Sequence, residues 1–498
     1  MTPYITEKNR QPLTDLQKLE NWLGSYAPTA YAVERGRVIS IGDGVAWIEG
    51  LPSARVDELL DFTDGSVGMV FDLRENLVGA IILKQTEQLT AGIEVHRTAR
   101  PLGLTASDEL LGRVIGPLGN PLDDKPAVQQ GAWLPLETQT PKIHQRDFVH
   151  KPLYSGIRLI DSMIPIGRGQ RQLIIGDEGT GRSVIALNTL LQQKDENIRC
   201  IYVLIGQKRT AAIQLLETLR ASGADQYTTV IVADGGELAG LQYLAPFAGC
   251  ALAAHWMWQG HHTLVIYDDL ATHARSYREL SLLLRRPPGR EAYPGDVFSV
   301  HAQLLEQATC LAPELGGGSM TALPIAETQQ GEISAYIPTN LISITDGQIY
   351  LDKGLFAGGF RPAIDVGKSV SRIGGKAQHP ALRQEAGRMK LDYARFLELE
   401  VFTRFGAKLE PAMQQVIHRG QLLREILKQD RLERSSPSQQ LAWMLAFNEG
   451  LFDALQPQQV QAQLQQLWAL VAELPLDLDS PKDQWLASVQ QVLQVSSC

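Results

Sequence analysis

Cysteine is scarce in this chain, and what there is forms no recognisable pattern. Four cysteines occur in 498 residues, far apart and without a CxxC spacing: Cys200, Cys250, Cys310 and Cys498. Such cysteines are expected to be reduced thiols, not a disulfide framework. The ten histidines contain no HExxH spacing, and we expect the adjacent His261 and His262, beside a predicted strand, to be a surface pair. The sequence therefore predicts no transition-metal site.

Patterns for secretion, for a membrane span and for an excess of positive charge are also missing. Residues 1–10 contain no apolar core of a signal peptide, so the chain is expected in the cytosol. The most apolar stretch, Tyr243 to Trp258, is too short to span a bilayer and contains Pro246 and His255, so it predicts a buried helix. The net charge of −9 argues against a nucleic-acid partner.

The most informative motif that is present is a glycine-rich loop of the form GxxxxG[KR][ST]. Its residues are Gly176, Asp177, Glu178, Gly179, Thr180, Gly181, Arg182 and Ser183. The apolar run 172–175 precedes it as a strand, and 184–191 follows as a buried helix. Backbone N–H groups of such a loop and the N-terminus of the helix bind phosphate, and Ser183 is placed to coordinate Mg²⁺. We therefore predict a nucleotide site, with Arg182 where lysine is usual.

Two further strand ends fit this nucleotide site. Residues 264–267 are apolar and end at Asp268, which is our candidate to bind a phosphate-bound Mg²⁺. Gln207 ends another apolar run, where a hydrolytic ATPase usually has a glutamate that polarises the attacking water. An amide orients water but cannot accept its proton, so the site is expected to turn nucleotide over poorly or not at all. Ordinary strand-end polar residues are the alternative interpretation of both.

The texture of the sequence changes along the chain and predicts a multidomain α+β protein. Residues 13–24 have helical spacing, and short alternating apolar runs between 36 and 100 predict a small β-barrel. Continuous apolar strands then alternate with helical patterns, which is typical of a parallel sheet covered on both faces. From Pro380 on the periodicity is helical, including the glutamine-rich tract 456–466. The predicted parts are an N-terminal helical extension (1–25), a β-barrel domain (26–102), a RecA-like α/β P-loop domain (103–378) and a C-terminal helical domain (379–498).

Several long motifs resemble the α subunit of F-type rotary ATP synthases. They are the segments 154–170, 266–270, 284–297, 315–319 and 366–375. The resemblance covers nearly the whole chain. It implies a β-barrel crown, a RecA-like nucleotide domain and a helical domain. It further implies three copies alternating with three catalytic β subunits in an α3β3 hexamer, with a central-stalk γ subunit and peripheral-stalk subunits, and with the membrane rotor sector as an indirect partner. The expected location is the cytoplasmic face of the membrane, as a peripheral protein.

The resemblance also assigns roles to individual residues. It implies a non-catalytic site for ATP or ADP with Mg²⁺, consistent with Gln207, and contacts from Arg361 and Gln429 to the bound nucleotide. It implies that Arg372, with Ser369 close by, reaches the catalytic site of the neighbouring β subunit. A planar guanidinium suits that role because it pairs two phosphate oxygens. The alternative for Arg372 is a salt bridge within its own domain.

The chain departs from the family pattern at its own nucleotide loop. Arg182 is longer and bulkier than lysine, Glu178 brings negative charge where arginine is usual, and Gly179 removes a side chain from the pocket. Together these changes predict weak or absent ATP binding. Asp430 and Arg431 stand where small or amide residues are more common. The apolar segment 251–258, with two tryptophans and a methionine, predicts core packing, or else a further subunit contact.

Other functions stay open at this level. The chain is expected to be a non-catalytic, regulatory α subunit of an ion-translocating ATP synthase or ATPase. One alternative is a nucleotide-free assembly scaffold of the same complex. Another is an independent hexameric RecA-like ATPase, which Gln207 and the altered loop oppose. A vacuolar or archaeal-type B subunit is a weaker alternative, because the sequence of residues 286–296 resembles the F-type α subunit more closely.

Overall fold

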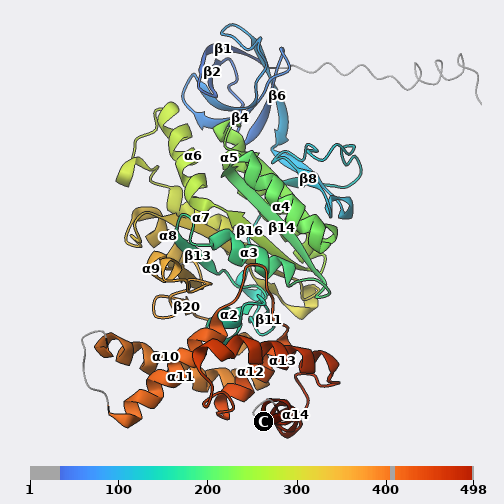
Figure 1. Cartoon of the computed structure of the whole chain (residues 1–498). Helices are drawn as coiled ribbons and strands as arrows, with labels where there is room; N and C mark the ends of the chain where they lie inside the picture. The colour runs from blue at the N-terminus through green and yellow to red at the C-terminus, as the bar shows by residue number, and fades with distance from the viewer. Residues whose placement is uncertain (1–33, 404–409, 496–498) are drawn as a thin grey trace, which may run out of the picture.

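The structure, a computed structural model, describes residues 34–403 and 410–495, and within these the chain forms three parts stacked along one axis (Figure 1). A β-barrel lies at one end, an α/β domain in the middle and a helical domain at the other end. This order confirms the predicted architecture. The helix expected at residues 13–24 and Cys498 lie outside the described residues.

The first part is a closed six-stranded barrel with the order β1-β2-β5-β4-β3-β6. Its strands are β1 Arg35–Gly42, β2 Val45–Glu49, β3 Glu58–Phe62, β4 Val67–Leu73, β5 Val78–Lys84 and β6 Glu94–Pro101. Alternating side chains point inward and form a separate apolar core around Ile48, Leu60 and Ile82. The barrel closes because β6 pairs with both β1 and β3, which leaves neither strand as a free sheet edge.

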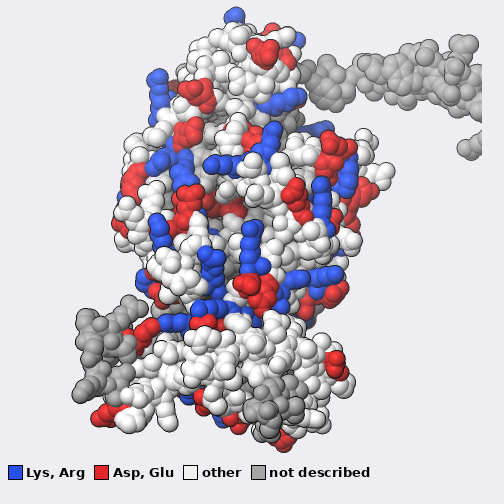
Figure 2. All heavy atoms as spheres, viewed as in Figure 1, with Lys and Arg blue, Asp and Glu red and all other residues white. Residues whose placement is uncertain are grey.

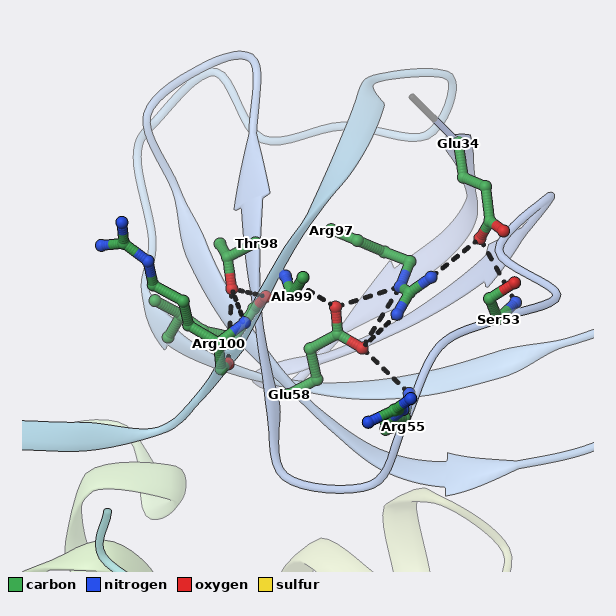
Figure 3. A network of polar contacts seen from close by, with 9 residues as sticks. Glu34, Ser53, Arg55, Glu58, Arg97, Thr98, Ala99 and Arg100 are labelled. Atoms are coloured by element: carbon green, nitrogen blue, oxygen red, sulfur yellow. Dashed lines mark hydrogen bonds and ion pairs between the residues drawn. The ribbon is translucent and has the colours of Figure 1, made fainter. Parts of the chain in front are cut away.

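A buried carboxylate holds the closing strand of the barrel (Figure 3). Glu58 on β3 is 4% exposed, and its oxygens accept hydrogen bonds from Arg97 Nε at 3.0 Å and Nη2 at 3.1 Å on β6. The carboxylate also accepts the backbone N–H groups of Arg55 and Ala99, each at 3.0 Å. Hydrogen bonding to Glu58 raises the pKa of Arg97, so the arginine stays charged. The ion pair therefore fixes the β3–β6 pairing, and Arg97 extends it to Glu34 at 3.3 Å.

The middle part contains a mostly parallel sheet with the order β20-β19-β13-β18-β16-β14-β15-β8. Its strands are β8 Val114–Ile115, β13 Leu173–Asp177, β14 Ile198–Gln207, β15 Thr228–Asp234, β16 His262–Asp268, β18 Ser319–Thr328, β19 Gly347–Leu351 and β20 Val370–Ser371. Smaller pieces are β7 Gly103–Ala106, β9 Ala132–Pro135, β10 Arg146–Asp147, β11 Pro152–Leu153, β12 Ile166–Gly167 and β17 Cys310–Leu311.

Helices cover both faces of this sheet, which explains the continuous apolar strands. Alternate residues of β14 enter different cores: Tyr202 and Leu204 share a core with α3, whereas Ile201 and Val203 share one with α5. The helices are α2 Arg158–Met163, α3 Arg182–Leu191, α4 Arg209–Ser222, α5 Ala239–Trp258, α6 Leu270–Leu283, α7 Val297–Glu306, α8 Tyr336–Ile344 and α9 Lys353–Ala357. Short 3₁₀ turns span Asp108–Leu110, Ile143–Gln145, Ala224–Tyr227, Arg290–Ala292, Pro313–Leu315, Gly374–Ala377 and Pro457–Gln459.

The third part is a helical bundle that docks on the middle domain through α2. Its helices are α10 Pro380–Thr403, α11 Pro411–Leu427, α12 Pro437–Asn448, α13 Val460–Glu473 and α14 Lys482–Val495. Trp443 and Trp485 are fully buried in it. At the junction the Asp161 carboxylate accepts hydrogen bonds from Ser155, Gly156 and Gln440, so one buried group connects the two domains. The glutamine-rich tract forms the start of α13, with Val460 and Leu464 buried, as predicted.

The structure confirms some of the predictions for the apolar stretch 243–258 and the histidines that follow it, and not others. The apolar stretch is the buried helix α5, as predicted, and no described helix is long and apolar enough to cross a membrane. Trp256 and Met257 are core residues, but Trp258 is 40% exposed, so core packing holds for only part of that segment. The predicted surface pair is only partly exposed: His261 and His262 are both half-buried, and His262 lies within β16 with its Nδ1 2.9 Å from Ser319 Oγ. Burial lowers the pKa of His262 to about 4, so it is neutral at physiological pH.

Candidate nucleotide-binding site

The glycine-rich loop connects β13 to α3 at the carboxyl edge of the sheet. Gly179 and Gly181 have φ values of +77° and +100°, a region that side chains with a Cβ rarely adopt. This conformation turns the loop tightly into α3, which begins at Arg182. Parallel strands end at the same edge, so β14, β16 and β18 bring Gln207, Asp268 and Glu327 toward this loop.

Two side chains of the loop are used to hold the loop itself. The Asp177 carboxylate accepts hydrogen bonds from Thr328 Oγ1 at 2.6 Å and from the Gly331 N–H at 2.8 Å. Thr180 Oγ1 donates to the Asp177 carbonyl at 2.7 Å. These contacts anchor the loop to the end of β18. The side chains of Asp177 and Thr180, two of the predicted cofactor-binding residues, therefore hold the shape of the loop.

Arg182 is paired inside the protein with a carboxylate that the sequence analysis did not select. Its Nη2 lies 3.4 Å from Glu327 Oε2, and both side chains are largely buried. Its buried Nη1 has no hydrogen-bond partner among the described residues, so part of the donor capacity of the guanidinium is unused. Glu327 ends the apolar run of β18, the same pattern that pointed to Asp268, and this signal was present in the sequence.

Asp268 lies at the centre of a small polar cluster. Its Oδ2 accepts from Tyr202 at 2.7 Å, and its Oδ1 is 3.4 Å from Gln207 Nε2. Burial and the neighbouring Asp269 raise the pKa of Asp268 to about 6, against hydrogen bonds from Tyr202 and Ser183 that lower it. The structure thus brings Ser183, Gln207 and Asp268 together. A serine hydroxyl and a carboxylate are oxygen ligands that suit Mg²⁺, so these residues fit the predicted ion.

An apolar cavity of about 240 Å³ lies beside the loop, of the concave and mostly apolar kind that binds small ligands. Its lining includes Gly179 and Gly181 of the loop, together with Arg361 and Gln429. Arg361 stacks over Phe356, with 4.8 Å from Cζ to the ring centroid. Glu178 is exposed and is not part of the lining.

Gln429 lines this cavity, and hydrogen bonds hold its side chain in place. Its Oε1 accepts from the Arg158 N–H at 2.9 Å, and its Nε2 donates to the carbonyls of Gly156 at 2.7 Å and Glu433 at 2.8 Å. Its backbone N–H also donates to the Arg361 carbonyl at 2.8 Å. With these groups engaged, Gln429 offers the cavity a fixed wall. Asp430 and Arg431 complete that wall.

Arg372 and Ser369 lie apart from this cavity, on the segment around β20. The Arg372 side chain is exposed, and its guanidinium has no hydrogen bond or ion pair among the described residues. Its backbone N–H donates to the Asp346 carbonyl at 2.8 Å. The Ser369 hydroxyl donates to the Asp365 carbonyl at 2.6 Å and accepts the Tyr350 N–H at 2.9 Å. Ser369 therefore holds the segment, and Arg372 projects from it.

Comparison with known proteins agrees with this geometry. The α/β domain has a P-loop, and the neighbouring strands of its mostly parallel sheet end in acidic and amide residues. This domain lies between a barrel and a helical bundle, an arrangement that defines a nucleotide-binding protein of the RecA-like class. Three family models match in order: the β-barrel domain of the ATP synthase alpha/beta family at residues 33–99, its nucleotide-binding domain at 156–371, and the C-terminal domain of the ATP synthase alpha/beta chain at 378–478.

Individual relatives carry the same assignment over nearly the whole length. The chain is 69% identical over 478 residues to ATP synthase subunit alpha 1 of Hahella chejuensis, covering 96% of this chain and 97% of the relative. It is 53% identical over 496 residues to ATP synthase subunit alpha 1 of Legionella pneumophila strain Paris, covering 99% of each. It is 48% identical over 476 residues to ATP synthase subunit alpha 2 of Albidiferax ferrireducens, covering 94% and 89%. The chain belongs to the α-subunit family of F-type ATP synthases.

Proposed function

We propose that this chain is a non-catalytic, regulatory α subunit that supplies Arg372 to the catalytic site of a neighbouring β subunit. The observation that carries the proposal is the exposed guanidinium of Arg372, which has no partner among the described residues. An arginine that stabilised its own domain would be expected to have a carboxylate or carbonyl beside it. This exposure supports a role toward another chain.

The base of Arg372 is rigid, as a residue that positions a charge should be. Ser371 Oγ donates to the Pro165 carbonyl at 2.7 Å and accepts the Gly374 N–H at 3.1 Å. Beneath it, Arg171 and Asp346 form a two-point ion pair with distances of 3.0 and 2.8 Å. A braced backbone places the guanidinium with little loss of conformational entropy on assembly. Such an arginine typically contributes about 10³ to 10⁵ in rate to phosphoryl transfer.

The chain's own site is proposed to bind ATP or ADP with Mg²⁺ weakly and not to hydrolyse it. Gln207 has no carboxylate to take a proton from water, and Arg182 is already paired with Glu327. A phosphate must therefore compete with Glu327 for the same guanidinium. Ser183 and Asp268 would hold the ion, which neutralises phosphate charge when bound.

The proposed setting is an α3β3 hexamer with alternating catalytic β subunits, around a central-stalk γ subunit and in contact with peripheral-stalk subunits. The membrane rotor sector is an indirect partner, and the complex couples ATP synthesis or hydrolysis to transport of H⁺ or Na⁺. The proposed location is the cytoplasmic face of the membrane. Figure 2 shows acidic and basic side chains interspersed over the middle domain, without one large patch of a single sign on that face of the described chain.

The test is Mg-ATP turnover by the purified chain alone and after mixing with its β subunit. We expect turnover only in the mixture, and a loss of about 10³-fold or more with Arg372→Ala. Arg220→Ala is the matched control, because Arg220 is also exposed but lies on α4, far along the chain from β20. Turnover by the chain alone would refute the non-catalytic assignment, and equal activity of both variants would refute the role of Arg372.

A nucleotide-free assembly scaffold is the second candidate, and the Arg182–Glu327 pair favours it. In that case the mixture is active, but the chain's own site never binds nucleotide. Equilibrium binding of Mg-ATP to the purified chain separates the two functions. Saturable binding at millimolar concentration or below supports a regulatory site, and its absence supports the scaffold.

A further inference from the structure

A second cavity, of about 250 Å³, lies where the barrel meets the middle domain. Its walls come from the segment just before β3, from β4, from the end of β6, from the end of β9 and the segment after it, and from α5 and α7. Most of the lining is apolar, including Met69, Leu244 and Leu304, with the aromatic rings of Tyr243 and Phe247 along one side. The cavity is separate from the nucleotide site, with which it shares no lining residue.

The polar groups in this cavity include hydrogen-bond acceptors that the protein leaves unused. The Asp57 carboxylate is half-buried and has no hydrogen bond or ion pair within the described chain. Gln307 is 2% exposed, and its buried Oε1 has no hydrogen-bond partner among residues 34–403 and 410–495. Its Nε2 donates to the Thr138 carbonyl at 2.7 Å, which fixes the orientation of the amide. The Gln307 Oε1 atom is itself covered by protein, so the accessible acceptor of the lining is the Asp57 carboxylate. A carboxylate without a donor is costly to bury, so the site is complementary to a molecule that brings donors.

The nearby cation does not satisfy Asp57. Arg286 is the basic residue that acts on the Asp57 carboxyl, but its guanidinium stacks over Phe71 and donates to the Phe71 carbonyl at 2.8 Å. At the rim Glu137 adds a second carboxylate, which accepts from Gln303 Nε2 at 3.0 Å. The cavity is therefore apolar in its walls and negative at one end.

We propose that this cavity binds a small organic molecule with a primary ammonium group and an apolar body about the size of one ring. The ammonium donates to the Asp57 carboxylate, and the apolar body packs against Leu244, Phe247 and Leu304. A positive charge beside Tyr243 and Phe247 also gains from their ring faces. Neutral molecules of the same shape lack the charge and most of the donors, so the cavity selects for cations.

The test is isothermal titration calorimetry of the full-length chain with 2-phenylethylammonium as the probe and 2-phenylethanol as its uncharged counterpart. For a ligand of one ring in a preformed cavity we expect a dissociation constant on the order of 0.1 to 1 mM. The alcohol should bind at least about tenfold more weakly, because it lacks the charge-assisted hydrogen bonds. No saturable binding of the amine below about 10 mM, or equal binding of the alcohol, overturns the proposal.

The variant Asp57→Asn locates the site. Asp57 has φ +63°, a conformation that asparagine tolerates, so the fold is retained. We expect the amine to bind about 10- to 100-fold more weakly, because a charged acceptor is replaced by a neutral one. The matched control is Asp61→Asn, an exposed aspartate on the same β3 strand, which should bind the amine as the parent does. Unchanged binding by Asp57→Asn, or an equal loss in both variants, overturns the assignment.

Discussion

At the scale of single residues, the largest departure of this chain from a standard phosphate loop is Arg182. Its side chain forms an ion pair with Glu327 on β18, which partly neutralises the charge of the guanidinium. Lysine in the same place would carry a compact charge without the planar fork that faces Glu327. The partner of Arg182 is thus a carboxylate 145 residues away in the sequence.

Arg182→Lys should therefore strengthen nucleotide binding at the chain's own site. We expect Mg-ATP to bind about tenfold more tightly, because the ammonium no longer shares its charge with Glu327. Equilibrium binding to the purified chain measures the effect, with Arg220→Lys as a control on exposed α4. Weaker binding in Arg182→Lys than in the parent would show that Arg182 itself is the better phosphate ligand.

Asp57 gives a pH prediction for the second cavity. Burial, followed by the nearby Glu137, raises the pKa of Asp57 to about 6, while Arg286 opposes the shift and Tyr243 faces the same carboxyl. Below about pH 6 the carboxyl is protonated and loses its attraction for an ammonium. Binding of 2-phenylethylammonium should therefore strengthen as the solution changes from mildly acidic to neutral, and the dependence should flatten in Asp57→Asn. An affinity that is constant over this range would exclude Asp57 as the charged acceptor.

At the scale of elements, the barrel depends on the ion pair between β3 and β6. Arg97→Ala leaves the buried Glu58 carboxylate without its charged partner, and removing one member of a buried pair typically costs about 3 to 5 kcal/mol. The effect should be local, so we expect faster hydrogen exchange in β3 and β6. Arg35→Ala is the control, because the Arg35 side chain is 68% exposed and pairs with Glu94 at 3.6 Å. An exposed pair of this kind is worth at most about 1 kcal/mol, and equal effects of the two variants would contradict this account.

A second element-scale prediction concerns the contact of α6 with α7. His273 Nδ1 and His301 Nε2 are 3.0 Å apart in the core. Burial lowers the pKa of His273 to about 4, and burial together with His273 lowers that of His301 well below its usual value. The unfolded chain takes up protons below about pH 6.5 while the folded chain does not, so stability is complete above that pH and falls toward about pH 4. Each histidine contributes at most about 1.4 kcal/mol per pH unit in that window.

Melting temperatures measured from mildly acidic to neutral pH test this histidine pair. His301→Gln keeps a hydrogen-bonding side chain but cannot take up a proton, so its melting temperature should fall less steeply on acidification. His150→Gln is the control, since His150 is exposed and should leave the slope unchanged. A parent and a His301→Gln variant with the same slope would rule the pair out as the source of acid sensitivity.

At the scale of the whole molecule, the helical domain completes the wall of the cavity beside the glycine-rich loop. The buried Arg158 on α2 reaches across the junction to Glu433, with 3.3 Å between Nη1 and Oε1, and also contacts the Lys428 carbonyl. Gln429, which lines the cavity, hydrogen-bonds to the backbone of both Arg158 and Glu433. The contacts that dock the helical domain therefore also set the shape of this cavity.

Changes at this junction should be asymmetric. Glu433→Gln leaves the fully buried Arg158 charge unpaired and is expected to cost roughly 3 kcal/mol, whereas Arg158→Met removes the charge itself and should cost less. Differential scanning calorimetry should show the helical domain separating as an earlier transition in Glu433→Gln. A larger loss in Arg158→Met would mean that the hydrogen bond to Lys428, and not the charge pair, holds the junction.

Much of this protein could be predicted from sequence because the signals are local. Alternation marked the barrel, continuous apolar runs marked the parallel sheet, and helical spacing marked the third domain, since periodicity records which side of an element is buried. The loop at Gly176–Ser183 and the strand end at Asp268 followed from motifs of a few residues. The family resemblance rested on longer motifs and is confirmed by the comparisons.

Only the tertiary structure decided which side chains meet. Elements distant in the chain pair Glu327 with Arg182 and engage the amide of Gln429 in hydrogen bonds. They also leave the Arg372 guanidinium, the Asp57 carboxylate and Gln307 Oε1 without partners in the described chain. A sequence states the chemistry of each group, but hydrogen bonding and charge pairing act over a few ångströms between atoms. Those distances are set by how strands and helices from all three domains pack together.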